Sequence, residues 1–126
     1  MLHADHLAAY LPPVAYDQDL ADRIRVLLGS ETFTEKKMFG GLAFLTGGNM
    51  TVAASGQGGL MVRVDPNHLD ALLREPGAAA FEMGNRRPMK GWLRVDGDAV
   101  RDDAALATWI GRAVEYAGTL PAKGRE

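Results

Sequence analysis

Two adjacent glycines, Gly40 and Gly41, separate a charged segment from an apolar one, and they constrain the fold more than any other feature of the sequence. Residues 32–39 carry three charges among β-branched and aromatic side chains, whereas residues 42–45 are apolar and too few for a helix. Glycine in such a place allows a bend or the close approach of another backbone. We therefore interpret the pair as a bend in a β-strand, and expect Gly41→Val to lower the stability.

The glycine pairs do not fit a nucleotide-binding loop. The nearest approach to the dinucleotide fingerprint is Gly56-Gln57-Gly58, but Met61 stands where the third glycine belongs and a strand follows where a helix is needed. Neither Gly40-Gly41 nor Gly47-Gly48 is followed by the Gly-Lys-Ser/Thr ending of a phosphate loop. The glycines are therefore interpreted as turn and bend residues.

The remaining pattern predicts an α+β fold with one antiparallel sheet and helices mainly on one face. Asp17 is placed to cap a first helix that Gly29 ends, Asp65-Pro66 begins a short second helix, and Asp102 caps the last one. Apolar runs and alternating segments between them indicate strands. The predicted order is helix, three strands, helix, two strands, helix.

The chain has the size and composition of one globular domain, since its 126 residues are 47% apolar and 24% charged. We expect an N-terminal arm at 1–16, a domain at 17–123 and a tail at 124–126. No secretory signal or membrane span is predicted, and the absence of cysteine is compatible with a reducing cytoplasm. A net charge of −2 argues against nucleic-acid binding by this chain alone.

No constellation of residues predicts a reaction. The absence of cysteine removes thiolate nucleophiles and thiolate metal sites, and His3 and His6 in the arm make no defined metal site. The predicted helix caps account for several aspartates, although an acid–base pair built from distant segments stays open. We expect no catalytic, cofactor-binding or metal-binding residues, and no cofactor.

The strongest polar cluster lies in the second predicted hairpin. It combines cations with an indole that could stack or make a cation–π contact, and Lys36 and Lys37 are further candidates for the same surface. A solvated hairpin is the alternative interpretation. The candidate contact residues are Arg86, Arg87, Lys90, Trp92 and Arg94.

Several of these segments resemble the TfoX N-terminal domain family. The resemblance rests on the glycine block at residues 37–44, the turn at 48–50, the strand at 60–64, the Gly-Trp segment at 87–92 and the Leu-Pro pair at 120–121. It implies an α+β domain similar to secretion chaperones. The residues that it marks as fold-defining are Met38, Phe39, Gly40, Gly41 and Gly91.

The resemblance also implies a function. The family includes the N-terminal half of TfoX/Sxy competence regulators, which resemble transcriptional coactivators working with a transcription factor. We therefore expect a non-enzymatic, cytoplasmic regulatory module that acts through protein contacts, with a homodimer as a further expectation. The alternatives are a methyltransferase-like enzyme that modifies nucleic acid and an accessory nucleic-acid-binding protein.

Overall fold

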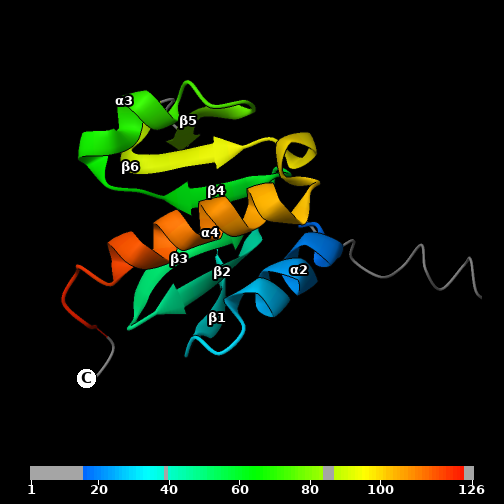
Figure 1. Ribbon diagram of the computed structural model, residues 1–126, viewed down its shortest axis with the longest axis vertical. Coiled ribbons are helices and arrows are strands. Elements are labelled where there is room, and N and C mark those ends of the chain that lie inside the picture. The colour runs from blue at the N-terminus through cyan, green and yellow to red at the C-terminus, as the bar shows by residue number, and fades with distance from the viewer. Residues whose placement is uncertain (1–15, 39, 84–86, 124–126) are drawn as a thin grey trace, which may run out of the picture.

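A computed structural model describes residues 16–38, 40–83 and 87–123 of the chain. One six-stranded antiparallel sheet forms its centre, with the strand order β1-β2-β3-β4-β6-β5. Helices α2 and α4 lie side by side across one face of this sheet (Figure 1). The predicted α+β class, with helices on one face of an antiparallel sheet, is confirmed.

The elements follow one another in the order that the sequence pattern predicted, with one additional strand. In chain order they are α2 (Gln18–Leu28), β1 (Thr34–Met38), β2 (Gly41–Thr46), β3 (Asn49–Ala54), β4 (Leu60–Arg63), the 3-10 turn η1 (Pro66–His68), α3 (Leu69–Leu72), β5 (Ala78–Met83), β6 (Arg87–Val95), the 3-10 turn η2 (Gly97–Val100) and α4 (Asp103–Ala117).

The predicted bend at Gly40 and Gly41 is a hairpin turn instead. Met38 pairs with Gly41, so the chain reverses direction between them and the expected bent strand becomes the antiparallel pair β1 and β2. Gly40 has a φ of +77°, which suits a tight turn because glycine has no Cβ. The prediction that this position requires glycine agrees with the positive φ of Gly40. The prediction that one bent strand continues after it was wrong, because the chain reverses direction there.

Local capping explains where the helices begin. The Asp17 carboxylate accepts a hydrogen bond of 3.1 Å from the Leu20 amide, as expected for an N-cap, and Gly29 ends α2 with a φ of +56°. Asp65 accepts from the Asn67 amide at the start of η1. Asp102 occupies the N-cap of α4, but its side chain makes no capping hydrogen bond there.

The sheet has a buried cluster on each face. The larger cluster joins α2, α4 and the α3 leucines to the inward side chains of β2, β3, β4 and β6. The smaller one, which we call the far-face cluster, lies on the opposite face and includes Met61 and Phe81. Its buried members are Ala43, Ala53, Met61, Phe81 and Trp92. Half-buried Met38 and Met50 pack against it, so both faces of the sheet contribute to the core.

Within the described ranges, no helix combines the length and the apolar character that crossing a membrane would require.

Candidate functional site

The cations expected to form a contact surface occupy different environments on β6. Arg86 lies outside the described residues, and so does Phe39, which was expected to be fold-defining. Arg87 begins β6, and its side chain lies outside what the structure describes. Lys90 is exposed further along the same strand. Of the candidate contact residues whose side chains the structure describes, Lys90 is therefore the most exposed cation.

Trp92 and Arg94 are both occupied within the fold. Trp92 is only 9% exposed and belongs to the far-face cluster, so its ring presents little surface for stacking on a partner. Arg94 donates a 2.9 Å hydrogen bond from its guanidinium to the Gly58 carbonyl, and thereby ties β6 to the turn between β3 and β4. Lys36 and Lys37 lie on β1, which β2, β3 and β4 separate from β6 in the sheet order.

Gly91 has a backbone conformation that allows β6 to continue past the end of β4. Its φ is +82°, and its carbonyl accepts a 2.8 Å hydrogen bond from the Val64 amide just beyond β4. A Cβ on Gly91 would also lie 3.4 Å from the Val64 carbonyl oxygen. This position therefore favours glycine through its backbone torsion, and it sets the turn of chain between Lys90 and Trp92.

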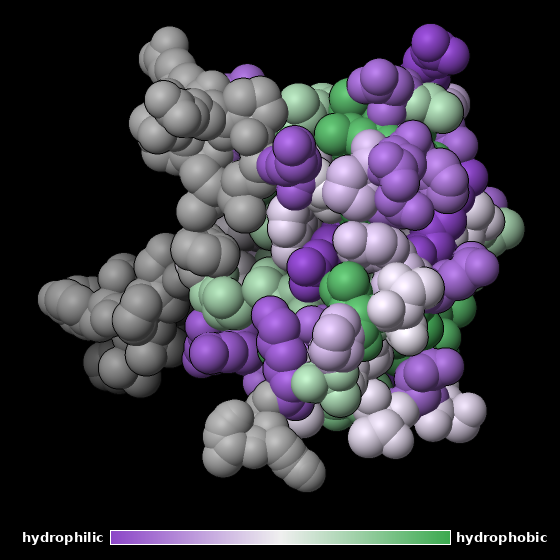
Figure 2. Space-filling view, turned by 90° about the vertical axis from the view of Figure 1, so that its left-hand side faces the viewer, coloured by the Kyte–Doolittle hydropathy of each residue, from purple (hydrophilic) through white to green (hydrophobic). Residues whose placement is uncertain are grey.

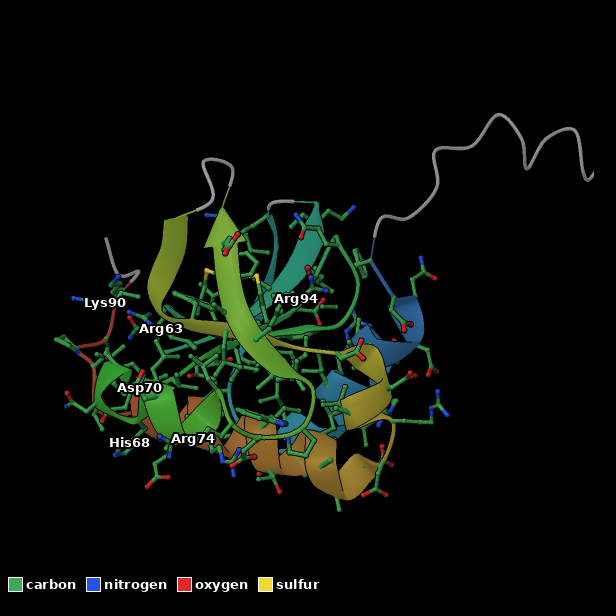
Figure 3. The ribbon with its side chains drawn as sticks, turned by 90° about the horizontal axis from the view of Figure 1, so that it is seen from above. Arg63, His68, Asp70, Arg74, Lys90 and Arg94 are labelled. Carbon is green, nitrogen blue, oxygen red and sulfur yellow. The ribbon has the colours of Figure 1, made fainter. Side chains whose placement is uncertain are left out.

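Arg63, which the sequence did not single out, lies beside this part of β6. It pairs with Trp92 across the ladder, and its guanidinium carbon lies 5.9 Å from the centre of the Trp92 ring and 5.9 Å from that of Tyr116 on α4. Contacts with two rings restrict the orientation of a guanidinium. Figure 3 shows Arg63 and Lys90 on the same side of the molecule as His68 and Asp70.

A hollow of about 420 Å³ opens next to Tyr116, between the η1–α3 segment and the C-terminal half of α4. We call it the α3–α4 groove. Val64, Leu72 and the Tyr116 ring contribute apolar surface, whereas polar side chains come from both walls. The polar lining residues are Asp65, Asn67, His68, Arg112, Glu115 and Thr119. Its size and mixed lining are those of a small-ligand or side-chain pocket.

The charges at the groove are partly paired. Arg112 donates two hydrogen bonds of 2.9 Å to the carboxylate of Glu75, and its guanidinium lies 4.6 Å from the Trp109 ring centre. Asp65 is engaged as the cap of η1. Within the described ranges, no group of three or more histidine, aspartate or glutamate side chains could hold a metal ion.

Sequence reasoning missed this groove because its residues come from separate segments. Val64 follows β4, His68 belongs to η1, and Tyr116 is near the end of α4. Each one alone is an ordinary loop, turn or helix residue. The sequence predicted the short helix at Leu69–Leu72, which forms one wall of the groove. It did not predict that α4 forms the other wall.

Comparison with known proteins gives one match that covers most of the chain. The model of the family described as the TfoX N-terminal domain matches residues 26–117. No curated protein and no solved structure matches the chain. The matched range runs from the last turn of α2 to the end of α4, and so includes every strand of the sheet.

Proposed function

Because the chain belongs to the TfoX N-terminal domain family, we propose that it is a non-enzymatic regulatory module that acts through protein contacts. The partner that we propose is a transcription factor, and the compartment is the cytoplasm. The candidate residues of the proposed contact surface are Arg86, Arg87, Lys90, Trp92 and Arg94 of the second hairpin, and Lys90 is the exposed cation among those whose side chains the structure describes.

The observation that carries this proposal is the distribution of paired and unpaired cations. Four arginines form ion pairs with carboxylates of the same chain: Arg23, Arg25, Arg101 and Arg112. Within the described ranges, Arg63 and Lys90 form none, and they lie on the paired strands β4 and β6. In the same part of the chain, Lys36 and Lys37 on β1 are likewise without an ion pair, so they serve as the comparison in the test below. Cations without a carboxylate partner on paired strands favour contact with an acidic surface, because little ordering is needed on binding.

The test is a quantitative pull-down with charge reversal. Arg87→Glu combined with Lys90→Glu should lower the recovery of specific partners, identified by mass spectrometry from native cells. Lys36→Glu with Lys37→Glu on β1 is the matched control, because it makes the same change in charge at exposed positions of the opposite sheet edge. Unchanged recovery with the β6 variant would refute the proposed surface.

Two further measurements separate this proposal from the alternatives. Saturable binding of S-adenosylmethionine in calorimetry would favour a methyltransferase-like enzyme. Affinity for DNA or RNA that falls steeply with salt would favour a nucleic-acid-binding protein.

The assembly that we propose is a homodimer. Strand β5, next to β6, stands at one edge of the sheet, and an edge strand can pair with that of a second copy. Light scattering should then give twice the monomer mass, and a monomer at all concentrations would contradict this part of the proposal.

A further inference from the structure

We propose that the α3–α4 groove and Arg63 together bind a peptide segment in which a large apolar side chain lies next to a carboxylate. This inference deepens the proposed function and rests on it, since it assigns a chemical class of partner to a protein-binding module. Its two parts are a groove that accepts the apolar side chain and a guanidinium that pairs with the carboxylate.

The groove has room for a large side chain. Its volume of about 420 Å³ lies between α3 and α4, and Val64, which is only 1% exposed, contributes to its lining. Leu72 is half-buried, and Ala71 is exposed, so a small residue leaves the entrance open. Burial of a phenylalanine or leucine side chain against Ala71, Leu72 and Tyr116, which retain exposed surface, would remove apolar surface from water on both partners.

The guanidinium of Arg63 is positioned for an anion. Its 5.9 Å distances to the Trp92 and Tyr116 ring centres hold it between β6 and α4, and Tyr116 also lines the groove. Within the described part of the chain, no carboxylate pairs with Arg63. A planar fork of donors restricted in this way binds a carboxylate with little loss of side-chain entropy.

The other charged residues around the groove indicate where each part of the ligand binds. Asp65 and Glu115 both line the groove, whereas the guanidinium of Arg112 is already paired with Glu75, so an anionic group placed inside the groove would meet two carboxylates. The groove therefore suits the neutral apolar group, and the anion belongs at Arg63, with Lys90 on the same side of the molecule (Figure 3). The same carboxylates disfavour a nucleic acid, whose charge repeats along its length.

The surrounding surface fits a short segment better than a broad interface. Figure 2 shows this side of the molecule, where hydrophobic residues lie singly or in small groups among hydrophilic ones. A permanent subunit interface has a continuous apolar centre. A local apolar hollow with a neighbouring cation is more typical of a site that takes one anchoring side chain and one charge.

The experiment titrates the isotopically labelled protein with three small probes and follows backbone amide shifts by NMR. N-acetylphenylalanine carries both the ring and the carboxylate, N-acetylphenylalaninamide carries only the ring, and N-acetylglycine carries only the carboxylate. We expect saturable shifts at Val64, Ala71 and Tyr116 with the first probe. Its apparent affinity should exceed that of the amide by about threefold to fivefold, the gain from one partly exposed ion pair.

Two variants separate the two parts of the site. Arg63→Gln should remove the preference for the carboxylate probe over the amide probe while ring binding persists. Ala71→Glu changes an exposed helix position, so it should fold, and its added charge should weaken the carboxylate probe. Ala104→Glu is the matched control, because it introduces the same side chain at an exposed position of α4 outside the groove.

Several outcomes would overturn the inference. They are equal binding of the three probes, the absence of a saturable shift, shifts located away from the groove, or larger shifts at the same amides with an oligothymidylate. The pull-down with the β6 variants is independent of these probes. Loss of partners there, with no probe bound in the groove, would refute this inference and leave the proposed function standing.

Discussion

Gly40 and Gly41 are adjacent, but different physical constraints act on them. Gly40 has a φ of +77°, and a Cβ there would meet nothing closer than 3.9 Å, so its torsion is what favours glycine. A Cβ on Gly41 would lie 2.3 Å from the Ala54 carbonyl oxygen and 2.9 Å from the Gly56 nitrogen. Both are backbone atoms, so they cannot rotate away, and strands β2 and β3 would have to separate.

Gly41→Ala should therefore lower the free energy of unfolding by about 1–3 kcal/mol, the usual cost of forcing an extra group into packed structure. Gly111→Ala is the control, because Gly111 lies within α4 with nothing inside 4 Å of its added Cβ. That variant should raise the stability by about 0.5–1 kcal/mol through helix propensity. Urea unfolding of the two variants measures both values, and a Gly41→Ala protein as stable as the unchanged one would contradict the close approach.

A pair of charged residues connects helix α2 to the edge strand β1. Arg25 Nε and Nη2 donate hydrogen bonds of 2.5 and 2.9 Å to the two carboxylate oxygens of Glu35. These hydrogen bonds hold the pKa of the Glu35 carboxyl below its ordinary value, and the charge of Arg25 adds to the effect. Because β1 is mostly exposed, burial contributes little to holding it, and this contact links it to the helix layer.

We expect Glu35→Gln to destabilise the protein at pH 7 and to have no effect in strong acid. The folded-state pKa is lowered, so the pair stabilises the fold above the unfolded pKa of about 4.3 and loses this effect as the pH falls through the folded value. The loss at neutral pH should stay below about 1 kcal/mol, because both side chains are partly exposed. Urea unfolding at several pH values measures the difference.

Asp98→Asn provides the comparison for that experiment. The ion pair of Asp98 with Arg101 joins side chains that are 79% and 80% exposed, so solvent screens it and its loss should change little at any pH. A Glu35→Gln protein that behaved like Asp98→Asn at pH 7 would show that the link between α2 and β1 contributes nothing measurable.

The sequence predicted the elements better than their contacts. Asp17, the apolar stripe of α4 and the alternation in β4 are local signals, because capping and periodicity depend on neighbours within one turn or one pleat. The turn at Gly40 was misjudged because a bend and a reversal both require glycine, and only the pairing of Met38 with Gly41 distinguishes them. The α3–α4 groove depends on which helix packs beside which, and no local pattern specifies that.

At the scale of the whole molecule, the central strands of the sheet have a buried cluster on each face, and each of the two tryptophans belongs to one of these clusters. Trp109 is 4% exposed and belongs to the cluster under the helices, whereas Trp92 belongs to the far-face cluster. Leu93 and Trp92 are adjacent on β6 but point into different clusters. The same strands therefore support both clusters, and loss of one exposes the backbone pairing that supports the other.

This shared sheet predicts that the two clusters unfold together. In a Trp109→Phe variant the only fluorescent indole is Trp92, and in a Trp92→Phe variant it is Trp109. Each substitution will shift the midpoint, so the comparison is made within one variant: its fluorescence and its far-ultraviolet circular dichroism should change at the same urea concentration. Loss of Trp92 burial at clearly lower urea than the loss of secondary structure would show that the far-face cluster opens separately, and that β5 with Phe81 is a local unit of lower stability.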